Sequence, residues 1–329
     1  MKSHTYEFEL LDLLKLVASG LVPLLAFGAL MHAGARLSFL PAPRPTLDAE
    51  RTVLVHQVES AQAAGAAEVL LVGDSSCLMN VSARELEREL GRPVLNLATF
   101  SFLDLAAHAA LVHEHARANP GRLKTVVLLQ HPETLRRLSP ERHYTNVLAH
   151  LLTGNDLPPT VGFEAQLRHA LGLDCFQARV LARVLPLPLS GAYGRRYGFT
   201  HDLDAHMGRE RGSLVDPDPA AFGKRPEYRL AVTLEKSSRA FRSALPDGVE
   251  LFVGITPVPE KFADQVFRQW QRDHLTLWSA WLQPAVALTN LTAVLPDESF
   301  MRTTHLREAA IPSYTKTLAE GIRGHLSTP

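Results

Sequence analysis

Residues 68–76, EVLLVGDSS, predict a buried strand that ends in a turn, because they are an apolar run of typical strand length followed by Gly-Asp-Ser. Apolar runs recur at 124–130 and 250–255, and amphipathic helical patterns lie at 82–90 and 103–118. Near-continuous apolar strands separated by helices indicate a parallel sheet that helices cover on both faces. The sequence therefore predicts an α/β fold, a three-layer α/β/α sandwich with a parallel, doubly wound sheet.

The remaining elements continue this alternation, except in one long segment. We expect shorter strands at 93–96 and 291–295, a helix up to about Trp281 and a last helix at about 309–325. Between residues 130 and 250 the alternation fails, and residues 139–225 contain prolines and short helical pieces. Departures of this length inside a compact domain are usually lids or binding segments, so we interpret 139–225 as an insertion.

The stretch before this domain is long and apolar. Residues 16–35 contain no Asp, Glu, Lys or Arg, and about 20 apolar residues suffice to cross a membrane. Pro23 and the glycines of this stretch are tolerated better in a membrane helix than in a soluble one. We therefore predict a short N-terminal segment at 1–15, a transmembrane anchor at 16–35, a Pro-rich linker at 36–46 and the α/β domain at 47–329.

A buried core helix and a cleaved secretory signal are the alternative interpretations of the apolar stretch. Residues 33–35, Ala-Gly-Ala, resemble a signal-peptide cleavage site. The acidic residues before the stretch and its length disfavour a signal peptide. Lys and Arg residues lie on both sides of the stretch, so their distribution leaves its orientation open.

Composition excludes several classes of protein. The 34 Lys and Arg residues balance the 34 Asp and Glu residues, which disfavours a nucleic-acid-binding protein that neutralises phosphates. Cys77 and Cys175 are the only cysteines, so a disulfide framework and a cysteine zinc site are excluded. The 15 histidines are scattered without an HExxH pair. We expect no metal site and no cofactor.

Ser75 stands where a nucleophile would lie in such a fold. It follows the first predicted strand directly, and ligands of parallel sheets bind outside the carboxyl ends of the strands. A serine hydroxyl needs a base that removes its proton. His305, in a predicted loop after the last strand, is the candidate base. The alternative is a structural turn in which Asp74 or a serine caps the following helix.

Three segments together resemble the SGNH/GDSL hydrolase superfamily: VLLVGDSS at 69–76, VLNLATFS at 94–101 and SFMRTTHLREAAIPSYTKTLAEGI at 299–322. They are most similar to its membrane-anchored branch, which partners membrane-bound O-acyltransferases in acylating extracytoplasmic polysaccharides. The resemblance covers about residues 66–134 and 248–326. It implies that Ser75 is the nucleophile, that its backbone amide is the first oxyanion donor and that His305 is the general base.

The chain departs from the pattern of this superfamily at two oxyanion positions. The glycine of the second segment aligns with Ser101, whose backbone amide could still donate. The expected asparagine after the strand at 124–130 is missing, and Gln130 and His131 stand in that region. Either side chain could supply the donor, or both could be structural.

A further departure concerns the acidic partner of the base. The superfamily usually places an aspartate three residues before the histidine, where this chain has Arg302. An arginine cannot accept the imidazole N–H or stabilise the imidazolium. Asp74, Asp297 or Glu298 could substitute, as could a backbone carbonyl.

The resemblance implies acyl transfer, most simply of acetyl, to a polysaccharide through a Ser75 ester, together with a membrane-bound O-acyltransferase. It also implies a cytoplasmic segment at 1–15 and a periplasmic or other extracytoplasmic main domain on a single-pass anchor. A carbohydrate esterase with the same Ser75 and His305 is one alternative. A catalytically weakened subunit that binds a glycan or the acyltransferase is the other. The polymer, the acyl group and the oligomeric state stay open.

Overall fold

The computed structural model describes residues 10–37, 49–137, 140, 142–153 and 229–325, apart from residues 66, 102, 264, 292–293 and 303. The chain divides into two compact units. One comprises Met1–Asp48 and Leu157–Gly198, and the other comprises Ala49–Asp156 and Phe199–Pro329. Most of the predicted linker at 36–46 and of the predicted insertion at 139–225 lies outside the described residues.

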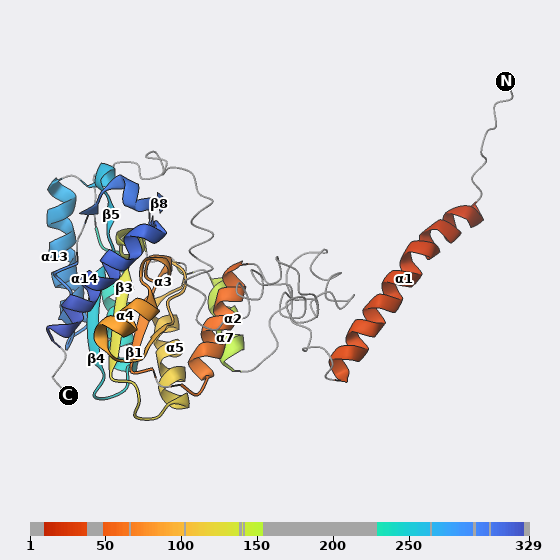
Figure 1. Ribbon diagram of the computed structural model, residues 1–329, viewed down its shortest axis with the longest axis horizontal. Helices are drawn as coiled ribbons and strands as arrows, with labels where there is room; N and C mark the ends of the chain where they lie inside the picture. The colour runs from red at the N-terminus through yellow and green to blue at the C-terminus, as the bar shows by residue number, and fades with distance from the viewer. Residues whose placement is uncertain are drawn as a thin grey trace, which may run out of the picture. The chain divides into compact units, whose positions relative to one another are not determined.

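The larger unit is built on a five-stranded sheet (Figure 1). Its strands are β1 (Val69–Gly73), β2 (Val94–Asn96), β3 (Thr125–Gln130), β4 (Glu250–Ile255) and β6 (Val286–Ala287). Their order is β2-β1-β3-β4-β6, and all neighbours run parallel. Every residue of β1 and β3 is buried, which explains why these strands read as continuous apolar runs. The predicted α/β fold with a parallel sheet is confirmed.

Helices cover both faces of this sheet. Alternate residues of β1 and β3, among them Leu71 and Leu129, share a core with Leu318 and Ile322 of the last helix. The helices of that face are α3 (Ser75–Asn80), α4 (Ala83–Leu90) and α14 (Ile311–Arg323). Since successive strand residues point to opposite faces, the other residues meet α5 (Leu105–Ala118) and α13 (Gln265–Trp281), and α12 (Leu234–Ala244) packs against both of these helices. Helix α2 (Ala49–Gln62) packs on α5, and α7 (Arg142–Leu152) packs on α2.

Smaller elements lie around the carboxyl ends of the strands. Helix α6 (Pro132–Arg137) follows β3 directly. β5 (Val258–Pro259) pairs with β7 (Val294–Leu295), and β8 (Phe300–Arg302) pairs antiparallel with β9 (His305–Leu306). Three short 3-10 helices, η3 (Glu260–Phe262), η4 (Asp297–Ser299) and η5 (Glu308–Ala310), complete the unit as far as the structure describes it.

Two expectations from the sequence need correction. The strand predicted at 291–295 is limited to β7, which lies in a separate two-stranded sheet, and the fifth strand of the main sheet is β6. A two-residue strand is too short to show a periodic apolar pattern. Helix α12 lies in the stretch where the alternation of elements fails. Its inward residues Leu234, Ser238 and Phe241 include a serine, which interrupts the apolar face.

The topology marks one position on the sheet. After β1 the chain enters α3 and α4 on one face, whereas the chain that follows β3 returns to β4 through α12 on the other face. β1 and β3 are adjacent, so the connections leave neighbouring carboxyl ends in opposite directions. Open parallel sheets bind their ligands at such a topological switch point. The ends of β1 and β3 are therefore the place to look for a site.

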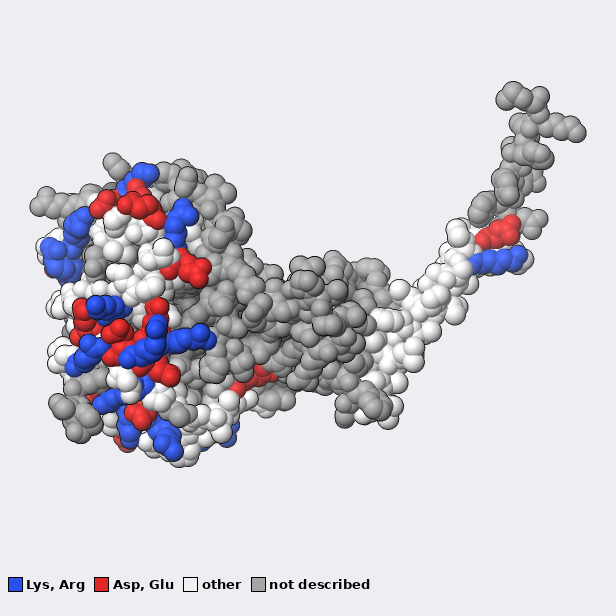
Figure 2. Space-filling model, viewed as in Figure 1, with Lys and Arg blue, Asp and Glu red and all other residues white. Residues whose placement is uncertain are grey.

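The surface of this unit mixes charges of both signs. Figure 2 shows blue and red side chains intermixed over the region of α4 and α14. Arg88 pairs with Glu85 at 3.3 Å within α4, and Arg323 of α14 pairs with Glu89 at 3.1 Å. Exposed pairs of this kind contribute little stability each, but they leave the surface without a strong field of one sign there.

The described residues of the N-terminal unit form a long apolar helix, α1 (Leu10–Arg36). It begins six residues earlier than the predicted anchor, because Asp12 and Lys15 are accommodated in its first turns, where their side chains pair at 3.5 Å. Its stretch Leu10–Gly34 is long and apolar enough to cross a membrane by length and composition. A membrane anchor and a signal sequence both have these properties.

Candidate active site at the carboxyl ends of β1 and β3

The turn after β1 begins with a glycine that no other residue could replace without strain. Gly73 has φ 149°, and a Cβ at this position would lie 1.8 Å from the carbonyl oxygen of Leu129 on β3. The two strands thus approach closely where β1 ends. Asp74 then caps α3, accepting a hydrogen bond from the Ser76 amide at 2.9 Å. Ser75 becomes the first residue of α3, half-buried at the edge of the sheet.

The structure brings Ser75 and His305 together. His305 lies on β9, and its Nε2 is 3.0 Å from Ser75 Oγ. Serine and histidine at this distance can form the hydrogen bond that links a nucleophile to its base. The two residues are 230 positions apart in the sequence, so this contact depends on the whole fold.

Asp74 is almost fully buried, with 1% of its surface exposed, and both of its carboxylate oxygens are engaged. Oδ1 accepts hydrogen bonds from the amide and the hydroxyl of Ser76, at 2.9 and 2.5 Å. Oδ2 accepts from the His131 amide at 2.8 Å and from the Thr134 hydroxyl at 2.5 Å. The carboxylate therefore ties the turn after β1 to the turn after β3, directly at the switch point.

Two of the carboxylates predicted as possible partners of His305, those of Asp74 and Asp297, have other partners of their own in the structure. The two carboxylate oxygens of Asp74 accept the hydrogen bonds from Ser76, His131 and Thr134 described above. Asp297 accepts a hydrogen bond from the Lys261 amide at 3.1 Å and forms an ion pair with its Nζ at 3.3 Å. Glu298 lies in η4 beside Asp297. The Arg302 side chain lies outside the described part of the chain.

The predicted oxyanion residues lie at the ends of β2 and β3. Ser101 is exposed on the turn that follows β2. Gln130 ends β3 with its side chain buried, and His131 follows it, also buried. Burial lowers the pKa of His131, although the charges of Asp74 and Glu133 oppose this, so the neutral ring is favoured. Its Nδ1 accepts a hydrogen bond from the Glu133 amide at 3.2 Å. The role of these residues as donors stays a prediction.

Three hydroxyl residues that were not predicted from the sequence, Ser76, Thr134 and Thr256, support the site. Ser76 Oγ donates to Asp74 and also contacts Thr256 Oγ1 at 2.8 Å. Thr256 directly follows β4, and its amide donates to the carbonyl of Gln130 at 3.0 Å. With Thr134, these hydroxyls form a connected row across the ends of β1, β3 and β4. All three lie shortly after buried strands in the sequence, and this position indicates a site at the carboxyl ends of the strands.

A buried histidine, His108, lies on α5 behind this row. Burial lowers its pKa to about 4, and the charges of Asp74 and Asp104 only partly oppose this effect. Its ring is therefore neutral near pH 7 in the folded chain. In the unfolded chain the same ring has a pKa near 6.5, so the unfolded state binds more protons between these two values.

We expect His108 to make the fold sensitive to acid. Its contribution to stability is complete above pH 6.5 and is lost as the pH falls toward 4, on the order of 2 kcal/mol at pH 4.5. Urea unfolding at pH 7 and pH 4.5 should therefore show a smaller acid loss for His108→Gln than for the wild type. His113→Gln, on the exposed side of the same helix, is the control. An unchanged acid loss in His108→Gln would contradict this assignment.

The arrangement as a whole can carry out nucleophilic chemistry. A hydroxyl and an imidazole lie at hydrogen-bond distance, and a buried carboxylate and a row of hydroxyls hold the turns beneath them. Among the described residues, no group of three or more His, Cys, Asp or Glu side chains is placed to hold a metal ion. No protein-family model matches this sequence, and no curated protein is significantly similar to it.

Proposed function

We propose that this protein transfers an acyl group, most simply acetyl, through an ester on Ser75. The observation that carries the proposal is the 3.0 Å contact between Ser75 Oγ and His305 Nε2 at the switch point of the sheet. In the first half-reaction His305 accepts the hydroxyl proton while Oγ attacks the acyl carbonyl, and the proton then passes to the leaving group. In the second, His305 takes the proton of the acceptor hydroxyl as its oxygen attacks the ester carbonyl, and the proton then passes to Ser75 Oγ as the bond between Oγ and the acyl carbon breaks.

The proposed acceptor is a polysaccharide outside the cytoplasm, and the proposed partner is a membrane-bound O-acyltransferase. Both rest on the resemblance of three segments to the membrane-anchored SGNH/GDSL branch. Helix α1 supports this setting, since an anchor would keep the α/β unit beside a membrane partner. In this setting residues 1–15 are cytoplasmic, and the larger unit is periplasmic or otherwise extracytoplasmic.

Two other functions have support from particular observations. A carbohydrate esterase would use the same contact between Ser75 and His305, with water as the acceptor. A catalytically weakened subunit that binds a glycan or the acyltransferase is favoured by Arg302, which stands where the superfamily usually has an aspartate. Loss of the acidic partner slows such a site without abolishing its activity.

The test is acylation of the full-length chain in detergent with p-nitrophenyl acetate, followed by intact-mass analysis. We expect one acetyl group on the wild type and none on Ser75→Ala. The matched control is Ser60→Ala, because Ser60 Oγ lies 3.3 Å from His56 Nδ1 on α2 and is thus a second serine in contact with a histidine among the described residues. That contact lies within one helix, so Ser60→Ala should be acetylated as the wild type is.

The outcomes separate the candidate functions. Acetylation that persists in Ser75→Ala would overturn the proposed nucleophile. A folded wild type that stays unacetylated would favour the binding subunit. If the adduct forms, its decay in the presence and absence of an oligosaccharide separates the transferase from the esterase, because only a transferase passes its acetyl group to the sugar.

A further inference from the structure

Asn80, which was not among the predicted site residues, is the last residue of α3 and is fully buried. Its Nδ2 donates a hydrogen bond to the carbonyl of Thr304 at 3.1 Å. Its Oδ1 accepts a hydrogen bond from the amide of Leu306 at 2.8 Å. One side chain thus binds the backbone on both sides of His305.

The other edge of this short strand is held as well. Strand β9 pairs antiparallel with β8, with His305 opposite Arg302 and Leu306 opposite Phe300. The pairing continues where the Arg307 amide donates to the carbonyl of Ser299 at 2.8 Å. A strand of two residues forms few backbone hydrogen bonds with its neighbour. On the side of β9 that faces α3, the Asn80 side chain therefore binds the Thr304 carbonyl and the Leu306 amide.

Helix α3 therefore supports both reacting groups. Its first residue is Ser75, and its last residue binds the strand that carries His305. Between them, Cys77, Leu78 and Met79 are buried in the core beneath the sheet. The distance between Oγ and Nε2 is thus set across a single six-residue helix packed in the core.

We propose that Asn80 is a positioning residue that holds His305 at Ser75, an inference that rests on the acyl-transfer function proposed above. The backbone of His305 cannot move away from α3 without breaking both hydrogen bonds to the Asn80 amide. Nucleophile and base react efficiently only when they are closely aligned, and a misplacement of 1 Å costs about 10²-fold in rate. Asn80 acts on the rate through His305 and touches neither the acyl group nor Ser75 Oγ.

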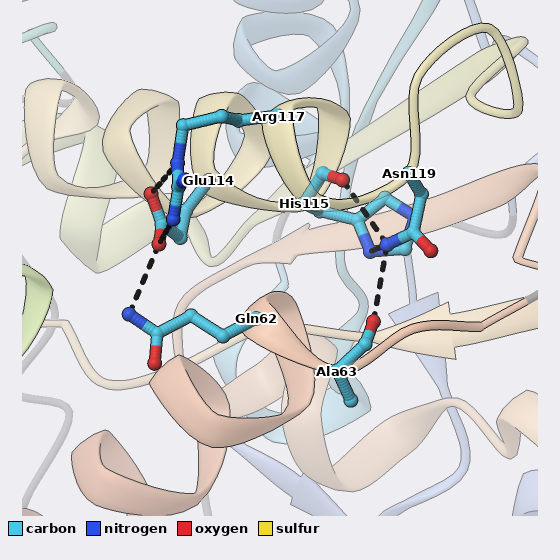
Figure 3. A network of polar contacts seen from close by, with 6 residues as sticks. All are labelled: Gln62, Ala63, Glu114, His115, Arg117 and Asn119. Carbon is cyan, nitrogen blue, oxygen red and sulfur yellow. Dashed lines mark hydrogen bonds and ion pairs between the residues drawn. The ribbon is translucent and has the colours of Figure 1, made fainter.

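The chain offers a closely matched control in Asn119, at the C-terminal end of α5 (Figure 3). Its Nδ2 donates to the carbonyl of Ala63 at 3.1 Å, and its Oδ1 accepts from the Gly65 amide at 2.8 Å. It therefore binds the backbone on both sides of one residue, as Asn80 does. Figure 3 shows it beside the Gln62, Glu114 and Arg117 contacts of the α2–α5 interface.

The experiment compares Asn80→Ala with Asn119→Ala in the full-length chain, with and without His305→Ala. Both asparagine variants lose the two hydrogen bonds that hold a neighbouring backbone segment, and Asn119→Ala also loses one to the His115 carbonyl, so both are expected to unfold at lower urea concentration. Only Asn80→Ala should slow the acetylation of Ser75, by about 10²-fold. In the His305→Ala background Asn80→Ala should have no further effect on the rate, since the group it positions is gone.

Equal rates for Asn80→Ala and the wild type would overturn the inference, as would a rate loss that is the same in both backgrounds. A second readout does not depend on turnover. In chains with ¹³C-labelled histidine, Asn80→Ala should change the titration curve of His305 in the NMR spectrum, and Asn119→Ala should leave it unchanged. If Ser75 of the wild type is not acetylated, the proposed acyl-transfer function is wrong. The titration of His305 then still shows whether Asn80 holds His305 in place.

Discussion

Replacing Gly73 with alanine is expected to prevent the larger unit from folding. The added Cβ would lie 1.8 Å from the carbonyl oxygen and 2.9 Å from the carbonyl carbon of Leu129, and 3.1 Å from Cys77 Cβ. The first two contacts are with backbone, so no change of rotamer relieves them. β1 and β3 would have to separate where Gly73 pairs with Leu129, at the centre of the sheet. The positive φ of Gly73 adds strain for any residue with a side chain.

The expected loss is at least about 4 kcal/mol, which is comparable with the whole stability of many domains. Gly91→Ala is the control for φ alone, because Gly91 has φ 63° and nothing within 4 Å of the added Cβ. It should cost about 1 kcal/mol. Gly254→Ala should fall between the two, since its Cβ would meet only the ends of leucine side chains. Urea unfolding followed by tryptophan fluorescence measures all three. If Gly73→Ala were as stable as Gly91→Ala, the close approach of β1 and β3 would be wrong.

Removing the imidazole of His305 is expected to lower the rate of p-nitrophenyl acetate turnover by at least about 10⁴-fold. The hydroxyl of Ser75 would then lose the group 3.0 Å away that takes its proton. The half-buried site around it would keep its shape, because Asp74, Ser76 and Thr134 bind one another without His305. The loss should therefore appear in the rate of acylation and not in the unfolding curve.

The same measurement in Ser75→Ala and in the double variant tests whether the two residues act as a unit. Residues that share one catalytic step give effects that do not add, so the double variant should be no slower than either single variant. His56→Ala, which removes the histidine beside Ser60, should retain the wild-type rate. If the losses of Ser75→Ala and His305→Ala multiplied, the two side chains would act separately and the proposed pair would be incorrect.

Much of the fold can be predicted from the sequence, because the buried strands are long enough to be recognised. β1, β3 and β4 are runs of five or six mostly apolar residues, and each was predicted to within two residues. Helix α4 has a clear start signal in Ser82, whose hydroxyl caps it. β6 could not be predicted, because the two residues Val286–Ala287 are too few to show a periodic pattern of apolar residues. Its place in the sheet depends on its pairing with β4.

Less of the candidate site can be predicted. Ser75 and His305 lie in segments that resemble motifs of one superfamily, so the resemblance is enough to predict that they act together. Asp74 is a predicted partner of His305, but its Oδ2 accepts hydrogen bonds from His131 and Thr134. These residues lie 57 and 60 positions away from Asp74, and no local sequence pattern indicates contacts over such separations. Asn80 was missed for the same reason, since its partners lie more than 220 positions further along the chain.

The order of the elements along the chain also has a consequence during synthesis. Ser75 is made 230 residues before His305, and β9 and α14 are the last strand and helix that the structure describes. At a translation rate of about 5–20 residues per second, the serine exists for roughly 10–50 seconds before its base has been made. On the proposed function, a growing chain therefore cannot capture an acyl group until its C-terminal elements have been added and have packed onto the sheet.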